Sequence, residues 1–240
     1  MTRVLYGVGV GPGDPELVTV KAVRLLHAAD VVMVPVTATG EQGRAEGIVR
    51  AHVDREVRRL VFALADDAAR DDAWDSAGAT VAAAYAAGAH TVAFATIGDP
   101  NVYSTFTYLA ETVRGLVPEL SVRTVPGVTA MQALAATSGR VLVEGRESLA
   151  LMPLTAGVDT LRRALDTHAT VVAYKGGRML PQMLAAVRES GRIDGAVYGA
   201  ALGLADEDVR AASELGTATR APYLSTLLVT PLRSGRGDRL

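Results

Sequence analysis

The sequence predicts an α/β protein made of two consecutive α/β domains. The chain has 240 residues, of which 49% are hydrophobic and 21% charged, so it is too apolar for a disordered protein and long enough for one large domain or two small ones. In the first half, short β-branched runs alternate with helical patterns, which is typical of a parallel sheet covered by helices. The pattern loosens after residue 118 and then resumes, and we therefore place the domains at residues 1–120 and 121–240.

The first half begins with an apolar strand, and a helical pattern separates each β-branched run from the next. In the first of these helices, Val18, Ala22 and Leu25 fall at positions i, i+4 and i+7, which gives one apolar face suited to covering a sheet. The expected strands are 4–10, 31–34, 56–63, 91–96 and 121–125, and the expected helices are 15–29, 41–51, 70–87 and 102–116.

The second half repeats this alternation with weaker signals. We expect strands at 148–152, 169–174, 194–200 and 223–230, and helices at 127–138, 157–167 and 178–190. Two further segments are expected outside the regular elements. The acid-rich residues 64–75 predict an exposed turn and the start of a helix, and residues 233–239 predict a frayed tail.

The composition excludes several classes of protein. Cysteine is absent, which excludes disulfides, thiolate nucleophiles and cysteine-based zinc sites. The four histidines lie too far apart to share a helical turn, so we expect no metal site, and a net charge of −2 argues against a nucleic-acid partner. The N-terminal residues show neither a basic leader nor an apolar run of membrane-spanning length, so we expect a cytoplasmic protein that does not bind a membrane.

Three strand-to-helix junctions carry glycine, at residues 7–17, 96–100 and 125–130. In the first two, an aspartate followed by proline forms a good helix start, which is a purely structural explanation of the pattern. The junctions also place flexible backbone at the carboxyl edge of a parallel sheet, where open α/β folds bind ligands. The first junction does not match a dinucleotide fingerprint, because the third glycine position holds Pro12 or Asp14, and no P-loop or serine-hydrolase elbow is present.

Four segments of the chain resemble the signatures of the tetrapyrrole methylases of the cobalamin and siroheme pathways. They are residues 9–17 followed by Thr19 and Lys21, and then residues 98–100, 126–130 and 222–226, in the right order over nearly the whole chain. Further stretches resemble one branch of this family, whose members methylate a bridging carbon of the ring. These stretches are residues 34–36, 45–49, 98–106, 144–149 and 174–178.

The resemblance implies an S-adenosylmethionine-dependent methyltransferase with a tetrapyrrole substrate. It also implies a homodimer of chains with two α/β domains and a ligand cleft between them. The cofactor contacts that it implies are Pro12 in the first junction, Ile97, Gly98, Asp99 and Val102 in the second, Thr129 and Ala130 in the third, and Tyr174, Lys175, Ala201 and Leu202 in the second domain. Relatives often carry a charged residue or a threonine near residues 201–202, so only a backbone contact is expected there.

Methyl transfer from a sulfonium to an electron-rich carbon depends mainly on positioning, and one proton must leave after the attack. Related uroporphyrinogen methylases carry an acidic residue at the end of the second strand, where this chain has Pro35. Asp14 and Tyr103 are therefore the candidate catalytic residues, although a helix cap and a packing role explain them equally well. Candidates for binding the acidic arms of the substrate are Arg44, Arg146 and Arg178, together with Lys175.

Three hypotheses about function remain open at this level. The first is methylation of the bridging carbon of a tetrapyrrole. The second keeps the fold and changes the target, to another ring position or, as in the diphthine synthases, to a protein side chain. The third is a sensor or scaffold that binds the cofactor without catalysis. Pro35 slightly favours the third hypothesis, and the three intact glycine junctions disfavour it.

Overall fold

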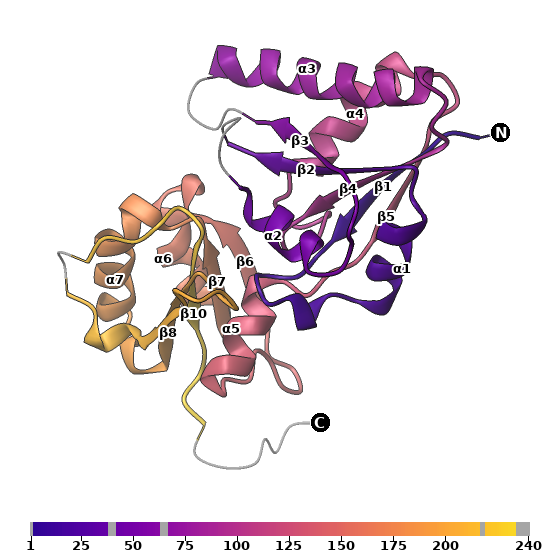
Figure 1. Cartoon of the computed structure of the whole chain (residues 1–240). Coiled ribbons are helices and arrows are strands. Elements are labelled where there is room, and N and C mark those ends of the chain that lie inside the picture. Colours follow the sequence, from indigo (N-terminus) through magenta and orange to yellow (C-terminus); the bar gives the residue numbers. More distant parts are fainter. Residues whose placement is uncertain (1, 38–41, 63–66, 217–218, 234–240) are drawn as a thin grey trace. The chain divides into compact units, whose positions relative to one another are not determined.

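The computed structural model describes residues 2–37, 42–62, 67–216 and 219–233, although the side chains of residues 67–70 are not described. Within these residues the chain folds as two compact units, Met1–Thr129 and Ala130–Leu240 (Figure 1). Each unit is considered by itself below.

The first unit contains a five-stranded parallel sheet with the strand order β3-β2-β4-β1-β5. Its strands are β1 (Val4–Gly9), β2 (Val31–Val36), β3 (Val57–Val61), β4 (Thr91–Thr96) and β5 (Ser121–Val125). Because all five strands run in the same direction, their carboxyl ends meet at one edge of the sheet. The central strands β1, β2 and β4 are almost entirely buried, as expected for a sheet that is covered on both faces.

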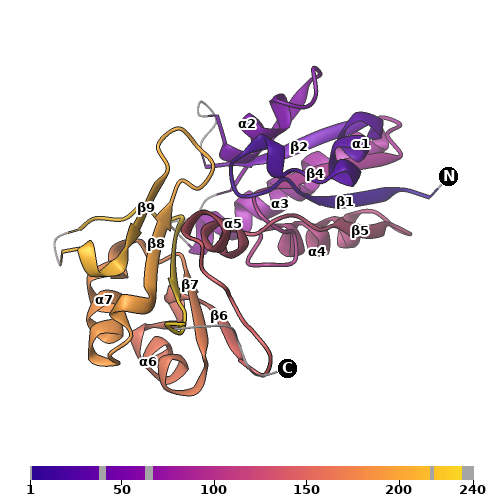
Figure 2. The ribbon, with the colours of Figure 1, turned by 90° about the horizontal axis from the view of Figure 1, so that it is seen from below.

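Helices cover both faces of this sheet (Figure 2). The helices are α1 (Val20–Ala28), α2 (Arg44–Arg50), α3 (Asp67–Ala86) and α4 (Phe106–Leu116). One core lies under α3 and α4, where Phe94 contacts both Phe62 and Phe106. The second core lies under α1 and α2, where Leu26 and Ile48 pack on the β1, β2 and β4 side chains. The first unit is therefore a doubly wound α/β fold.

Three helices of this unit begin later than the sequence pattern predicts: α2 begins at Arg44 instead of residue 41, and capping side chains explain the other two. The helix predicted at 15–29 is divided into a 3₁₀ turn, Pro15–Leu17, and α1, because the Thr19 hydroxyl accepts the N–H of Ala22 and starts a new helix. The helix predicted at 102–116 begins at Phe106, where the Ser104 hydroxyl accepts the backbone N–H. Both misplaced starts follow from capping side chains that compete with the preceding residues.

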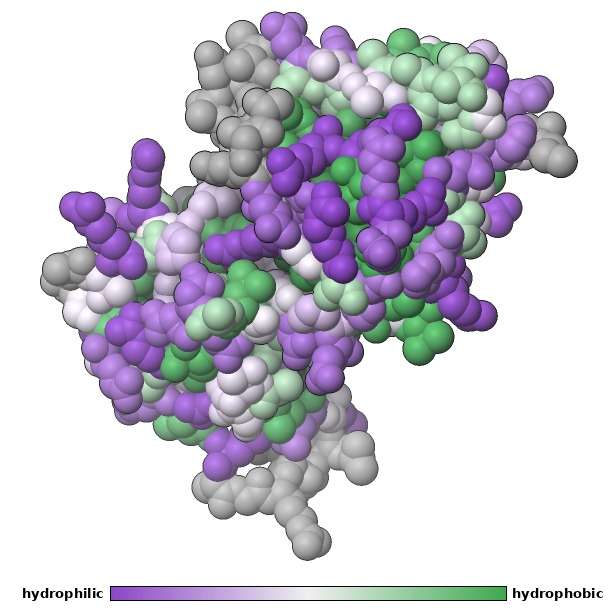
Figure 3. Space-filling model, in the orientation of Figure 1, coloured by the Kyte–Doolittle hydropathy of each residue, from purple (hydrophilic) through white to green (hydrophobic). Residues whose placement is uncertain are grey.

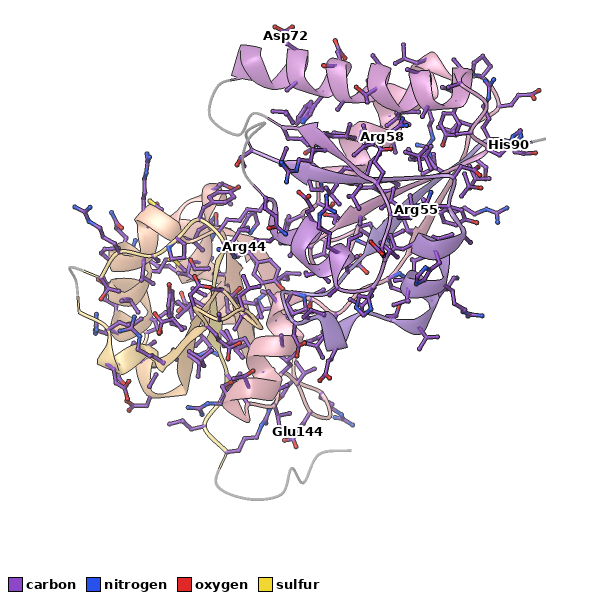
Figure 4. All side chains as sticks on the ribbon, in the orientation of Figure 1. Arg44, Arg55, Arg58, Asp72, His90 and Glu144 are labelled. Carbon is purple, nitrogen blue, oxygen red and sulfur yellow. The ribbon has the colours of Figure 1, made fainter. Side chains whose placement is uncertain are left out.

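A buried carboxylate joins α2 to the edge strand β3. The Glu46 side chain has no exposed surface, and it pairs with Arg50 at 2.8 Å and with Arg59 through contacts at 2.6 and 3.0 Å. The Arg59 hydrogen bond is the main reason why the pKa of Glu46 is lowered, and it outweighs the opposing effect of burial. Nearby, Arg55 and Arg58 (Figure 4) belong to a surface of the unit that is predominantly hydrophilic (Figure 3).

The second unit contains a mixed five-stranded sheet with the order β6-β7-β10-β8-β9, in which β6 and β7 are parallel and the remaining pairs antiparallel. Its strands are β6 (Leu149–Pro153), β7 (Thr170–Tyr174), β8 (Ala196–Ala200), β9 (Asp208–Ala211) and β10 (Ser225–Val229). The helices are α5 (Ala130–Ser138), α6 (Val158–Thr167) and α7 (Leu180–Glu189). The core holds α6 and α7 against one face, and α5 packs on the other, where Leu134 lies against Gly199.

The boundary between the units differs from the one that the sequence predicts. Residues 121–125 form β5, which pairs with β1 in the first sheet, so the first unit ends at Thr129 rather than at residue 120. Strand β9 has no counterpart among the predicted elements, because its four residues Asp-Val-Arg-Ala carry little β signal. The acid-rich segment 64–75 lies partly outside the described residues, as does most of the tail 233–239.

Candidate functional site

Three loops of the first unit meet at the carboxyl edge of its sheet. They are residues 9–14 after β1, residues 96–104 after β4 and residues 125–129 after β5, and we refer to them as the three-loop site. The strands β4, β1 and β5 are neighbours in the sheet, so their loops begin side by side. The Val10 N–H donates to the Thr96 carbonyl at 3.0 Å, and the Gly98 N–H donates to the Gly11 carbonyl at 2.8 Å. These bonds join the first two loops through their backbones.

Close backbone approach explains the glycines of this site. A Cβ atom on Gly127 would lie 2.1 Å from the Gly98 carbonyl oxygen, and one on Gly9 would lie 2.5 Å from the same oxygen. Gly98 is glycine for a different reason. Its φ is +67°, which side chains rarely adopt, and the nearest atom to an added Cβ is the Thr129 Cα at 4.0 Å. A Cβ atom on Gly98 would therefore overlap no protein atom.

Asp99 joins the second loop to the third. Its side chain is buried, with one oxygen accepting the Asn101 N–H at 2.8 Å and the other accepting the Gly127 N–H at 3.0 Å. The second of these bonds spans 28 residues of sequence. The helix start that the sequence predicts at Asp99 does not form, since α4 begins at Phe106, and the Asp99 carboxylate instead sets the relative position of two loops.

The other predicted residues of the first unit lie in or beside these loops. Pro12 and Thr129 are buried, whereas Ile97, Val102 and Ala130, the first residue of the second unit, are partly exposed. The structure therefore brings the predicted contacts of the three junctions together at one edge.

The two candidate catalytic residues have different surroundings. One oxygen of Asp14 accepts the Glu16 N–H at 2.8 Å, which is the helix-cap role that the sequence offers as an alternative. Tyr103 has φ +49°, and its side chain is 41% exposed. Partial burial raises the pKa of Tyr103, which keeps its hydroxyl protonated. Whether either residue takes part in catalysis stays a prediction.

In the second unit, the chain turns sharply at the carboxyl end of β7, at residues 174–178, which we call the β7 turn. Lys175 has φ +59°, a conformation that is costly for a residue with a side chain. The start of β10 holds this turn, because the Ser225 carbonyl accepts the Lys175 N–H at 3.1 Å and the Ser225 hydroxyl accepts the Gly177 N–H at 3.3 Å. The Tyr174 hydroxyl accepts the N–H of Met131 in α5 at 2.9 Å.

A second strained residue lies at the same edge of this sheet. Ala201 follows β8 and has φ +50°, and both Ala201 and Leu202 are buried. Strands β7 and β8 flank β10 on its two sides, so Tyr174 and Ala200 lie opposite Thr226 and Ser225. The predicted contacts of the second unit therefore share one sheet edge, and non-glycine residues with positive φ concentrate at functional positions in many proteins.

Tyr223 belongs to this edge although it was not among the candidate residues. The Lys175 ammonium lies 5.8 Å from the centroid of its ring, and the Tyr223 side chain is 47% exposed. Burial lowers the pKa of Lys175. The signal in the sequence was the segment 222–226, which carried the family resemblance without pointing to one side chain.

The candidate substrate-binding arginines do not form one cluster. Arg44, the first residue of α2 (Figure 4), follows Gly43, which lies against the Pro35 carbonyl at the carboxyl end of β2 and so at the edge that carries the three-loop site. Arg178 is exposed in the 3₁₀ turn after Gly176, close to Lys175. Arg146 precedes β6, which runs parallel to β7, so it lies at the opposite sheet edge from Lys175, about 17 Å away along the strands.

The geometry of the three-loop site suits a ligand that is held by backbone rather than by charged side chains. Among the described residues, no group of three or more His, Asp or Glu side chains is placed to hold a metal ion, and no helix is long and apolar enough to cross a membrane. Because an added Cβ on Gly98 would meet only the Thr129 Cα, at 4.0 Å, a ligand could approach the backbone closely at this point.

This fold and these loops define a class of proteins. The model of the family of Tetrapyrrole (Corrin/Porphyrin) Methylases matches residues 4–218, and the chain belongs to this family of methyltransferases. Among curated proteins, the chain is 35% identical to a precorrin-2 C(20)-methyltransferase from Sinorhizobium sp over 236 residues, which cover 94% of each protein. It is 32% identical to the cobalt-precorrin-2 C(20)-methyltransferase of Salmonella typhimurium, with 95% of this chain and 97% of the relative covered.

Solved structures share the fold at lower sequence identity. A cobalt precorrin-4 methyltransferase superposes with a TM-score of 0.69 at 21% identity, covering 95% of this chain and 94% of the other. The uroporphyrin-III C-methyltransferase of Thermus thermophilus, in complex with S-adenosylhomocysteine, superposes with a TM-score of 0.65 at 22% identity, covering 95% and 97%. The predicted fold class, two α/β domains of the tetrapyrrole methylase type, is confirmed.

Proposed function

We propose that this chain transfers the methyl group of S-adenosylmethionine to C20 of precorrin-2, or of its cobalt form, in corrin ring synthesis. The observation that carries the proposal is the three-loop site, a glycine-lined edge that matches neither a dinucleotide nor a triphosphate pattern. Two relatives that align over nearly their whole lengths have names that state this position on the ring. Their agreement favours C20 over another ring position and over a protein side chain.

The residues of the three-loop site suit the binding of S-adenosylmethionine. Gly98 leaves space where any side chain would project, and Pro12, Ile97 and Thr129 surround that edge of the sheet. When bound, S-adenosylmethionine supplies an electrophilic methyl group on a sulfonium. The residues of the chain then have to hold the acceptor carbon in line with the bond that breaks, and a fixed backbone scaffold does this with little loss of entropy at the moment of reaction.

Binding of the substrate would need cations near this site, because a tetrapyrrole with acetate and propionate arms carries many negative charges. The net charge of −2 provides no long-range attraction, so recognition depends on local cations. Arg44 lies at the edge of the three-loop site, and Arg178 lies beside Lys175. We assign these residues to the acidic arms of the substrate. The position of Arg146 at the far edge of its sheet removes the geometric reason for including it.

One incubation tests the proposed function. The purified chain is mixed with ¹³C-methyl S-adenosylmethionine and enzymatically made precorrin-2 or cobalt-precorrin-2, and the product is analysed by mass spectrometry and NMR. We expect one added methyl group on C20. A label at another ring carbon would support the second hypothesis, and binding of the cofactor without transfer to either substrate would contradict the proposal and leave a protein side chain as target, or a sensor or scaffold. The homodimer that the resemblance implies is tested separately by light scattering.

Alanine variants test the substrate contacts. We expect Arg44→Ala and Arg178→Ala to raise KM for the tetrapyrrole about fivefold each at low salt, because one exposed charge contact contributes roughly 1 kcal/mol, and to leave cofactor affinity unchanged. Arg163→Ala, on α6 of the second unit, is the control, and Arg146→Ala should resemble it. Wild-type kinetics in both Arg44→Ala and Arg178→Ala would contradict the assignment.

A further inference from the structure

The hydrogen bond between Tyr174 and Met131 ties the start of α5 to the end of β7. The Tyr174 hydroxyl accepts the Met131 N–H at 2.9 Å, and the tyrosine side chain is only 9% exposed. Met131 is the second residue of α5, so its N–H belongs to the first turn, where backbone donors have no partner within the helix. A side chain that lies 43 positions further along the chain supplies that partner.

Tyr174 is itself held firmly. It is the last residue of β7, it lies opposite Thr226 in the sheet, and the next residue, Lys175, is fixed through its N–H to the Ser225 carbonyl. The hydroxyl therefore extends from a rigid base. A helix start that bonds to such a group is restricted to one position.

The start of α5 matters for the site because the third loop leads into it without an intervening residue. Thr129 is the last residue of that loop and is buried, and Ala130 opens the helix. A displacement of the first helical turn would move Ala130, a cofactor contact that the resemblance implies. Small errors in the position of contact groups are costly for binding and for methyl transfer.

We propose that Tyr174 is a positioning residue for the cofactor site, and that it acts through the Met131 N–H and not by touching the cofactor. The family resemblance assigns Tyr174 as a direct contact, so the two roles give different expectations. The proposal rests on the proposed use of S-adenosylmethionine. Its tests use S-adenosylhomocysteine as the probe, and one of them needs no ligand.

Calorimetry of the full-length chain with S-adenosylhomocysteine provides the first test. Tyr174→Phe removes the hydroxyl and keeps the ring, and we expect the Kd to rise about three- to tenfold, the loss of one hydrogen bond. Tyr85→Phe is the matched control, because the Tyr85 hydroxyl donates to the Val4 carbonyl at 2.8 Å at a distant point of the first unit. We expect this control to lower the melting temperature without changing the Kd.

Removal of the donor provides the second test. Met131→Pro deletes the same hydrogen bond from the other side, and the fold accepts proline at this position of a helix, since Pro181 is the second residue of α7. Met131→Ala, which keeps the N–H, is its control. We expect Met131→Pro to raise the Kd as much as Tyr174→Phe does, and the double variant to bind no more weakly than either.

The outcomes separate the two roles. Weak binding in Tyr174→Phe combined with wild-type binding in Met131→Pro would show that the tyrosine touches the cofactor, and the proposal would be wrong. An unchanged Kd in Tyr174→Phe would also overturn it. Without ligand, the amides at the start of α5 should exchange hydrogen faster in Tyr174→Phe than in the wild type. Equal exchange rates in the two proteins would refute the positioning role. A wild-type chain that binds no S-adenosylhomocysteine would instead refute the proposed function.

Discussion

Replacement of Gly98 by alanine separates the two reasons why this residue is glycine. With φ at +67°, any side chain is strained there, and the strain is expected to lower the free energy of unfolding by about 1–2 kcal/mol. An added Cβ would meet no protein atom closer than 4.0 Å, so overlap within the protein adds nothing to this cost. The methyl group would instead occupy the space where we expect the cofactor. Gly98→Ala should therefore weaken the binding of S-adenosylhomocysteine at least tenfold, or about 1.4 kcal/mol.

Gly139 provides the matched control for the strain. Its φ is +65°, and an added Cβ would have no neighbour within 4 Å. Gly139 follows the C-terminal end of α5, whereas the third loop leads into the N-terminal end of that helix. Gly139→Ala should therefore destabilise the protein by the same 1–2 kcal/mol and leave cofactor affinity unchanged.

Urea unfolding followed by circular dichroism measures the first effect in both variants, and titration calorimetry measures the second. Equal destabilisation with a loss of affinity confined to Gly98→Ala would support the placement of the cofactor. Wild-type affinity in a destabilised Gly98→Ala protein would refute it, because the glycine would then serve only the turn. Equal losses of affinity in both variants would refute it as well, since strain alone would explain them.

Two further variants test the energetics of the fold. Because Arg59 and Arg50 lower the pKa of Glu46 below 4.5, ionised Glu46 stabilises the folded state above that pH, and this contribution is lost as the pH falls through the lowered pKa. In thermal melts below pH 4.5, Glu46→Gln should thus show a flatter decline of Tm than the wild type, and parallel declines would contradict this. Ala201 has a φ of +50°, and Ala201→Gly should raise the free energy of unfolding by about 0.5–1 kcal/mol, because the relief of strain exceeds the entropy cost of glycine. Urea unfolding measures this change, and a decrease in the free energy of unfolding would show that the alanine is not strained.

The elements that could be predicted from sequence are those with strong local signals. Strands β1, β4 and β5 are rich in apolar or β-branched residues and have glycine or proline shortly after them, and all five strands of the first unit form near the expected positions. The glycine junctions were recognisable because glycine and proline close together after a strand are local features of the sequence. Strand direction then follows from the alternation with helices, and it brings the three loops to one edge without further information.

The details of the site depend on contacts that no local pattern encodes. The hydrogen bonds between Asp99 and Gly127 and between Tyr174 and Met131 join residues 28 and 43 positions apart. Neither bond can be predicted from the sequence around its residues. The same holds for Arg146, whose motif suggested a substrate contact and which precedes β6, at the sheet edge opposite to the β7 turn. A resemblance transfers the names of residues, whereas the sheet topology decides which of them can act together.

The chemistry of this site also explains why a proline is tolerated at the end of β2. Where catalysis depends on a strong acid or base, replacing that group removes most of the rate. In the proposed reaction the acceptor carbon is already nucleophilic and the leaving group is a neutral sulfide, so the residues mainly have to hold two reactants in line. In the three-loop site we assign this task to backbone groups, which close packing at Gly9 and Gly127 and the Asp99 hydrogen bond hold in place. Substitutions that shift these loops should therefore reduce the rate more than substitutions that remove a titratable group, and Pro35 is consistent with that order.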